Sequence, residues 1–224
     1  QNIVFFGGAG VSTESGIPDF RSEDGLYRQH YDYPPETILS HTFFVKNPQV
    51  FYRFYREKML VLHANPNPAH IALAKLEQQG KLKAVITQNI DGLHQKAGSQ
   101  NVLELHGSIW RNHCVKCKAF YTAEQIAQMQ LVPYCTCGGV IKPDVVLYEE
   151  ALSSSVLQRS VQAIQTADML IVGGTSLAVY PAAGLVDYFC GKHLVVINTS
   201  PLAMDKRAGL VIPQKIGQVL AQVV

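Results

Sequence analysis

The chain has 224 residues, of which 47% are hydrophobic and 16% are charged. These proportions predict a globular protein with a sizeable core, built as one domain or as one large domain with a small insert. The formal net charge is +2, and Lys and Arg form no run. The sequence therefore gives no support for a nucleic-acid-binding surface.

The longest uncharged run covers the 18 residues 169–186 and approaches the length of a membrane-spanning helix. Gly-Gly, Thr-Ser and Tyr-Pro interrupt it, so we interpret it as a strand, a loop and the start of a helix. The first residues lack the charged segment of a signal peptide. We expect a cytoplasmic protein that binds no membrane and acts as a monomer.

Apolar runs predict strands, and amphipathic runs with capping signals predict helices. In one predicted helix, Pro68 suits the first turn and Gly80 suits the residue after the last turn. Strands are expected at residues 2–6, 82–87, 101–107, 144–148, 168–174 and 193–200, and helices at 47–63, 67–80, 122–130, 153–167, 181–191 and 215–224.

Strands thus alternate with helices, and several strands are continuous Val/Ile/Leu runs. This pattern predicts an α/β fold in which helices cover both faces of a parallel sheet. Ligands of such folds bind at the carboxyl ends of the strands. Four of the expected strand ends carry unusual residues, in the stretches "GAG", "TQNID", "GGTS" and "NTS".

The glycine-rich stretch "GAGVSTESG" resembles a phosphate-binding turn, because Gly8 and Gly10 would let a pyrophosphate approach the backbone. The third glycine of the dinucleotide fingerprint would fall at Thr13, so the fingerprint is broken. On this stretch alone, a glycine turn that merely links a strand to a helix explains the residues equally well.

Other strand ends leave similar alternatives open. Residues 88–91 either begin a polar surface loop or bring two amides and a carboxylate into a pocket. His106 ends a strand shortly afterwards, which suits a general base, although a lone histidine is more often structural. Thr175 and Ser176 could hold a phosphate or ribose or could cap a helix, and Asn198 could bind a sugar hydroxyl or form a turn. Residues 19–21, between two glycines, suit a lid or a plain exposed loop.

The cysteines suggest a metal site. Four of the five fall into the pairs Cys114–Cys117 and Cys135–Cys137, which 17 residues separate. Four thiolates form a tetrahedral Zn²⁺ set without an open position for water, so we expect one structural zinc ion that holds a small lobe together. Free cytosolic thiols are the alternative. Cys190 is expected to be a buried apolar residue of a helix.

Taken together, these motifs resemble one family. "GAGVSTESGIPDFR", "TQNIDGLH", "ELHGS", the cysteine pairs, "IKPDVVLYEE", "GGTSLAVYPAAGL" and "VVIN" stand in the order seen in sirtuins, the NAD-dependent protein-lysine deacylases, and look like a bacterial member. The resemblance implies a single catalytic domain with a Rossmann-like part at residues 1–28, 85–110 and 143–224. A small lobe would contain a helical part at 29–84 and a zinc-binding module at 111–142.

The resemblance also implies roles for individual residues. His106 would be the general base, and Asn89 would help to hold the reactive conformer and a water molecule. Phe20 would shield the nicotinamide side, and Asp91 would face its positive charge. The implied cofactor residues are Ala9, Thr13, Phe20, Arg21, Gln88, Ile90, Asp91, Thr175, Ser176, Asn198 and Ile216; the implied substrate residues are Val146, Leu147 and Tyr148, which would pair the peptide as an added strand.

The implied reaction consumes NAD⁺, releases nicotinamide and moves an acetyl group from a protein lysine to ADP-ribose. Glu149 departs from the family, which often has glycine there, and could change peptide docking or favour basic flanking residues. Gly209 stands where an aspartate is common. Tyr52 and Tyr55 match the Tyr-x-x-Arg pair of desuccinylating members without its arginine, so uncharged acyl groups are expected. Mono-ADP-ribosylation of protein and a non-enzymatic NAD or ADP-ribose sensor are the alternatives.

Overall fold

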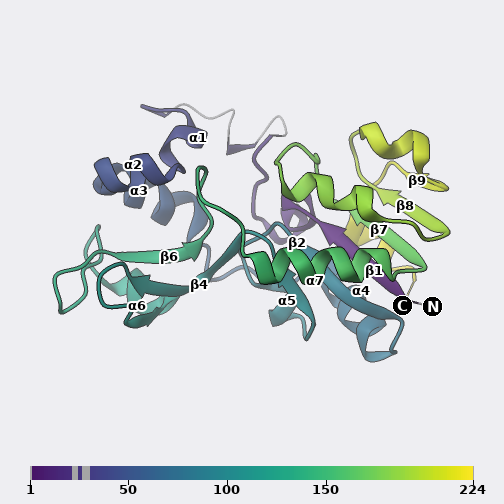
Figure 1. The fold of residues 1–224 in the computed structure, drawn as a ribbon, viewed down its shortest axis with the longest axis horizontal. Helices are drawn as coiled ribbons and strands as arrows, with labels where there is room; N and C mark the ends of the chain where they lie inside the picture. The colour runs from purple at the N-terminus through teal and green to yellow at the C-terminus, as the bar shows by residue number, and fades with distance from the viewer. Residues whose placement is uncertain (1, 22–24, 27–30, 224) are drawn as a thin grey trace.

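The larger part of the molecule is built on a six-stranded parallel sheet in the order β3-β2-β1-β7-β8-β9 (Figure 1). The computed structural model describes residues 2–21, 25–26 and 31–223. The strands are β1 Ile3–Gly7, β2 Leu82–Thr87, β3 Val102–Glu104, β7 Met169–Gly173, β8 His193–Ile197 and β9 Leu210–Ile212. Because the strand order reverses around β1, a crevice opens beyond the carboxyl ends of β1, β2 and β7.

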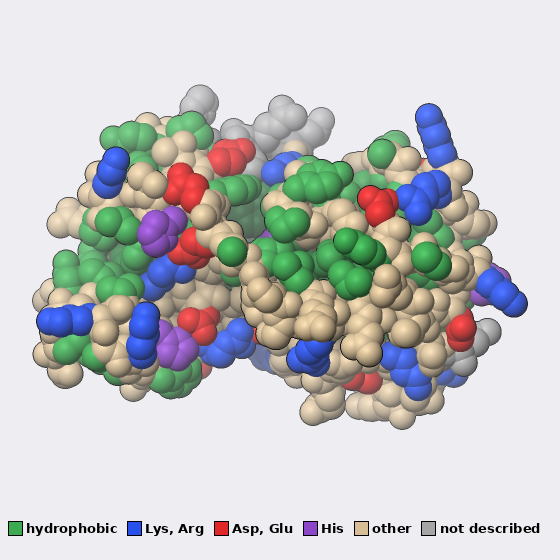
Figure 2. All heavy atoms as spheres, viewed as in Figure 1, with side chains coloured by type: hydrophobic (Ala, Val, Ile, Leu, Met, Phe, Trp, Pro, Cys, Tyr) green, Lys and Arg blue, Asp and Glu red, His purple; other side chains and the backbone are tan. Residues whose placement is uncertain are grey.

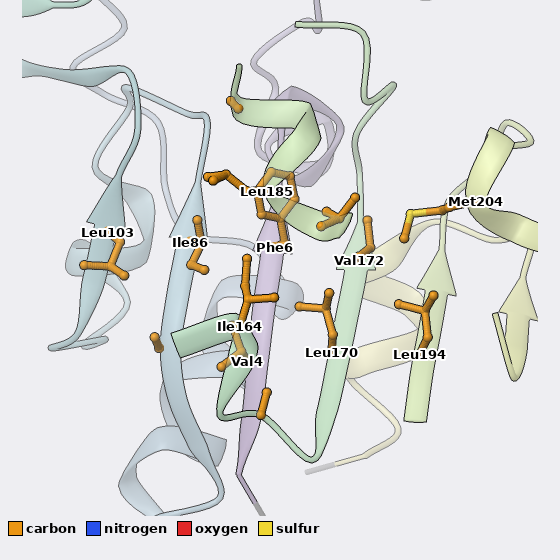
Figure 3. Close-up of a cluster of buried hydrophobic side chains, with 14 of the residues drawn as sticks. Val4, Phe6, Ile86, Leu103, Ile164, Leu170, Val172, Leu185, Leu194 and Met204 are labelled. Atoms are coloured by element: carbon orange, nitrogen blue, oxygen red, sulfur yellow. The ribbon is translucent and has the colours of Figure 1, made fainter. Parts of the chain in front are cut away.

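Helices cover both faces of this sheet, as the apolar strands predict. Val4 and Phe6 of β1 face one buried cluster (Figure 3), and Ile3 and Phe5 face the other. Helix α7 (Ser154–Gln165) and the 3-10 helix η5 (Ala182–Tyr188) cover the first face, while α4 (Pro68–Gln78) and α8 (Ile216–Leu220) cover the second. The alternation follows from the two-residue period of a strand whose two faces are both buried.

The smaller part combines a helical group with an antiparallel sheet in the order β5-β4-β6, at the left of Figure 1. Ile109 and Val145 of this sheet pack in one buried cluster with the helices. The strands are β4 Gly107–Cys114, β5 Phe120–Thr122 and β6 Ile141–Val145; the helices are α1 Pro35–Ile38, α2 His41–Lys46, α3 Pro48–Phe54, the π-helix η4 Tyr55–Met59, and α6 Ala123–Gln128.

Two expected boundaries differ from this packing. The resemblance predicts that residues 29–84 belong to the small lobe, but α4 and the start of β2 belong to the core of the large sheet. The resemblance also predicts that residues 85–110 and 143–224 belong to the large part. Residues 107–110 and 143–145, however, lie in β4 and β6, which pair with each other in the small sheet. Periodicity marked these segments as helix or strand but carried no information about which sheet they join. The expected boundary between 28 and 29 lies outside the described residues.

Most expected elements are present, with local differences. Helix α4 starts at Pro68 and is followed by Gly80 with a φ of 71°, as predicted. The helix expected at 181–191 is a 3-10 helix, the strand expected at 144–148 lies at 141–145, and the helix expected at 47–63 ends as a π-helix at Met59. Cys190 is exposed rather than buried. Among the described helices, none has the length and apolar character needed to cross a membrane.

Candidate functional site

The carboxyl ends of the large sheet open into a cavity of about 610 Å³, a volume that suits a dinucleotide-sized ligand. The surface is hollowed between the two parts of the molecule (Figure 2). All catalytic, cofactor and substrate residues inferred from the sequence line this one cavity: Ala9, Thr13, Phe20, Arg21, Gln88, Asn89, Ile90, Asp91, His106, Val146, Leu147, Tyr148, Thr175, Ser176, Asn198 and Ile216.

The glycine-rich turn lies directly against the loop that follows β7. Gly10 N–H donates to the Gly174 carbonyl over 2.8 Å, and a Cβ on Gly10 would lie 2.9 Å from Gly174 Cα. Only glycine fits such an approach without a shift of backbone. The turn continues as two 3-10 helices, Ala9–Val11 and Thr13–Ser15, and the Glu14 carboxylate accepts from Gly217 N–H of α8 over 2.7 Å. These contacts fix the turn at the cavity wall.

A buried polar network joins this turn to the residues after β2. Ser12 Oγ donates to Asp91 Oδ2 over 2.6 Å, and Asn89 Nδ2 donates to Ser12 Oγ over 3.0 Å. Leu93 N–H donates to Asp91 Oδ1 over 2.9 Å. Burial raises the pKa of Asp91, and the hydrogen bonds from Ser12 and Leu93 oppose that rise. Asn89 and Asp91 are therefore held in fixed orientations before any ligand binds.

Ser12 is the residue of this network that the sequence reasoning missed. Its side chain is only 1% exposed, and its hydroxyl is the atom on which Asn89 and Asp91 converge. The signal that could have found it is its position, between Ala9 and Thr13 in the quoted motif. The sequence separation of the partners, however, concealed their contact.

His106 lies at the junction of the two parts, directly before β4. Its Nδ1 is 3.0 Å from the Gln88 carbonyl oxygen, and a carbonyl only accepts, so Nδ1 carries the proton. In the neutral ring Nε2 is then the free acceptor, which is the form that a general base requires. Burial lowers the pKa of His106, opposed by the bond to Gln88. The ring therefore stays neutral to a lower pH than an ordinary histidine.

Three polar residues link neighbouring strand ends on the other side of the cavity. Gln88 Nε2 donates to Thr175 Oγ1 over 3.0 Å, and Thr175 N–H donates to Asn198 Oδ1 over 3.0 Å. Asn198 Nδ2 donates to the Ser200 carbonyl over 2.7 Å. The side chains of Gln88, Thr175 and Asn198 thus also hold the loops after β2, β7 and β8 together.

The expected substrate residues lie on the wall that the small part contributes. Val146 N–H donates to the His106 carbonyl over 2.9 Å. Tyr148 N–H donates to the Leu39 carbonyl and Tyr148 carbonyl accepts from His41 N–H, each over 3.0 Å. At Tyr148 the main chain pairs with residues 39–41 along one edge, and the addition of a peptide strand along the other edge stays a prediction. Of the lid expected around residues 19–21, Asp19, Phe20 and Arg21 all line the cavity, and 22–24 lie outside the described residues.

The four clustered cysteines fit a zinc ion. Their Sγ atoms all lie within 4.8 Å of one another, and the Cys114–Cys137 and Cys117–Cys135 pairs are each 3.5 Å apart. Tetrahedral Zn–S bonds of about 2.3 Å place sulfurs about 3.8 Å apart, close to these distances. Cys137 N–H and the Tyr121 hydroxyl lower the pKa of Cys135 to about 6. The hydrogen bond from Ala119 N–H lowers the pKa of Cys117, but hydrogen bonds with the other three sulfurs outweigh it and raise that pKa to about 12. A bound cation would favour the thiolate at all four positions.

Comparison with known proteins agrees with this geometry. The model of the Sir2 family matches residues 8–181. The chain belongs to the Sir2 family. An NAD-dependent protein deacetylase of Clostridium acetobutylicum is 60% identical over 100% of this chain and 93% of its own length. One of Clostridium perfringens is 58% identical over the same shares.

Solved Sir2 structures share the fold of this Sir2-family chain. A Sir2 structure with deacetylated p53 peptide and 3′-O-acetyl ADP ribose is 39% identical, with a TM-score of 0.92, covering 99% of this chain and 91% of its own. A Sir2 complex with p53 peptide and NAD⁺ is 40% identical, with a TM-score of 0.88 and the same coverage. The resemblance to sirtuins read from the motifs, and the α/β fold with a cysteine-bearing lobe, are confirmed.

Proposed function

We propose that this protein is an NAD-dependent protein-lysine deacetylase. The observation that carries the proposal is the position of His106, with Nε2 as its free acceptor, in the same cavity as Asn89 and Asp91 and beside the segment Val146–Tyr148. Binding of a dinucleotide alone would not require a neutral histidine at this place. NAD⁺ would supply a nicotinamide leaving group and a ribose that accepts the acetyl group. With one water molecule consumed, the products would be nicotinamide, free lysine and O-acetyl-ADP-ribose.

The two ends of the cavity suit the two ends of the cofactor. Ala9 and Thr13 of the glycine-rich turn suit the pyrophosphate, with Ser176, Asn198 and Ile216 toward the adenosine side. Gln88, Ile90 and Asp91 suit the nicotinamide ribose and ring, and the Asp91 carboxylate would favour the positive charge of nicotinamide before it leaves. Phe20 and Arg21 suit the closing side of the same pocket.

His106 would take a proton from a ribose hydroxyl at Nε2 while Nδ1–H stays on the Gln88 carbonyl. This bond holds the ring in one tautomer throughout, so the proton enters at a single nitrogen. Asn89, fixed by Ser12, would orient the reactive conformer and a water molecule. The acetylated lysine would enter past Val146 and Leu147, and the Tyr148 side chain would contribute to the channel while its main chain pairs with residues 39–41.

The cysteine set would hold a structural zinc ion. Four thiolates would occupy all four coordination positions of a tetrahedral zinc ion and leave none for water, so the metal would take no part in the acetyl transfer. Cytoplasmic location and action as a monomer stay predictions from the sequence.

One assay separates this function from the two alternatives. Purified protein is incubated with NAD⁺ and an acetyl-lysine peptide, and nicotinamide and all masses are followed. We expect nicotinamide release that depends on the acetyl group, with a peptide mass loss of one acetyl. Release with a mass gain on protein would instead indicate mono-ADP-ribosylation. Binding of NAD⁺ without nicotinamide release would indicate a sensor.

A further inference from the structure

The turn at the small-part edge of the cavity contains a residue in an unfavourable backbone conformation. Glu149 lines the cavity and has a φ of 74°, in the left-handed region that a side chain with a Cβ rarely adopts. A glycine would adopt this φ freely. The glutamate therefore needs a compensating interaction that keeps the turn in place.

The Glu149 side chain provides such an interaction with helix α2. Its Oε2 accepts from Thr42 N–H over 2.9 Å, and Thr42 lies in the first turn of that helix, whose N-cap Ser40 accepts from Phe43 N–H. First-turn N–H groups have no partner within their own helix. The hydrogen bonds from Thr42, followed by the charges of His41 and Lys46, lower the pKa of Glu149. The carboxylate is thus held ionised on α2.

The neighbours of Glu149 fasten the rest of the turn. Tyr148 pairs through its main chain with Leu39 and His41. Glu150 accepts from Leu147 N–H over 2.9 Å and from Lys142 Nζ over 3.0 Å, and its other oxygen lies 2.8 Å from His41 Nδ1. Within the part of the chain that the structure describes, the Glu149 N–H and carbonyl have no hydrogen-bond partner. Both groups belong to a residue that lines the cavity, so they are available to a ligand bound there.

We propose that Glu149 is a positioning residue for the acylated substrate, in addition to and resting on the proposed deacetylase function. Its carboxylate, anchored on Thr42 N–H, holds the left-handed turn in the conformation that offers the Glu149 N–H and carbonyl to the main chain of the acetylated peptide. The carboxylate then acts through the turn and does not read the charge of residues beside the acetyl-lysine.

Three substitutions test this anchoring. Glu149→Gln keeps an oxygen acceptor for Thr42 N–H, Glu149→Ala removes it while the strained φ remains, and Glu149→Gly removes it and the strain together. Glu124→Ala, in the first turn of α6, is the matched control, because Glu124 is an exposed glutamate that does not line the cavity. Peptide KM, NAD⁺ KM, kcat and hydrogen exchange of the Thr42 amide are measured for each.

We expect Glu149→Ala to raise the peptide KM about tenfold, the scale of one lost charge-assisted hydrogen bond, with NAD⁺ KM within about twofold. Glu149→Gln should stay within about threefold of the unmodified protein, and Glu149→Gly should lie between the two. Thr42 exchange should quicken in the alanine and glycine variants only. The increase in peptide KM of Glu149→Ala should be equal for peptides with arginine, alanine or glutamate beside the acetyl-lysine.

Three results would overturn the positioning role: an unchanged peptide KM in Glu149→Ala, equal increases of both KM values, or an increase confined to arginine-flanked peptides, which would mean that Glu149 reads charge. Failure of the proposed function looks different. Unmodified protein would then release no nicotinamide with any peptide, and peptide affinity measured by fluorescence anisotropy would still decide the role of Glu149.

Discussion

The large sheet and the cysteine-bearing module differ in what stabilises them. Strand residues of the large part, such as Phe5 and Phe6, are fully buried under helices on both faces. The core of the module has four buried residues, two of which are Cys114 and Cys135. The first region has enough apolar area to fold through burial. The second lacks it and depends on cross-links: the metal site and hydrogen bonds from the neighbouring helices.

The two parts of the molecule contribute different residues to the cavity. The rigid large part holds the turn, the Ser12–Asp91–Asn89 network and the loops after β2, β7 and β8. The small part supplies one wall of the cavity at Val146 and Leu147, and Leu147 packs in the cluster of the helical group rather than in the cysteine-bearing module. The site thus combines groups of the large part, which suit the cofactor, with a wall that the small part contributes.

Removing the metal should affect only the small module. We expect Cys135→Ser, or a strong chelator, to abolish zinc content and to unfold residues 111–142, because structural zinc contributes on the order of 10 kcal/mol to folding of such modules. Hydrogen-exchange mass spectrometry should show lost protection there and retained protection in β1 and β7. Cys190→Ser is the control. Absence of zinc by elemental analysis of the unmodified protein would contradict the assignment.

Replacing the proposed base should affect chemistry and leave both regions folded. His106→Ala is expected to lower kcat by about 10²–10⁴, the usual contribution of a general base, with a Tm close to that of the unmodified protein. His113→Ala is unsuitable as a control because it neighbours Cys114, so the exposed His63 serves, as His63→Ala. Full activity of His106→Ala would exclude the base.

Acid should destabilise the large part first, because it buries neutral histidines. His70 and His94 are 0% and 1% exposed with ring centroids 4.7 Å apart, and burial lowers the pKa of His70 to about 4. Between about pH 6.5 and 4 the unfolded chain binds a proton that folded His70 does not, so stability present above this window is lost as pH falls.

The expected loss is up to about 3 kcal/mol in the free energy of unfolding from His70 alone. Urea unfolding at pH 7 and pH 4.5 measures it. His70→Gln should reduce the pH dependence of the free energy of unfolding, because glutamine does not titrate in this range. Its amide oxygen can still accept from Asn67 N–H, the bond that His70 Nδ1 makes, so the variant should fold. An equal loss of unfolding free energy between pH 7 and pH 4.5 in both proteins would show that burial does not lower the pKa of His70.

The smallest effect should come from the contact between η4 and the module. Arg56 donates to the Leu131, Ala127, Ile126, Met129 and Gln130 carbonyls at distances of 2.7–3.3 Å. Arg56→Ala should destabilise the module by about 1–3 kcal/mol, because carbonyls at the end of α6 lose their donor. The exposed Arg53, as Arg53→Ala, is the control. Equal amide hydrogen-exchange rates at residues 123–131 in both variants would show that Arg56 does not stabilise the module.

Sequence reasoning found the parts of the site whose signal is local. Gly8 and Gly10 follow an apolar strand, residues 88–91 follow another, and the cysteine spacing is a ligand pattern in itself. It missed Ser12, since a serine inside a polar loop has no pattern of its own. It also misplaced α4, β4 and β6 among the two parts, because a helix or strand has the same period whichever core it joins.

By itself, the sequence determined the parallel α/β architecture, the family and the four-thiolate metal set. The alternation of strands and helices predicts the first, the order of the motifs indicates the second, and the spacing of the cysteines predicts the third, and each of these signals lies in short stretches of sequence. Only the tertiary structure decided which polar atoms meet. Ser12 and Asp91 are 79 positions apart in the chain, and Thr42 and Glu149 are 107 apart. Contacts over such separations depend on how complete elements pack, and no short stretch of sequence contains that information.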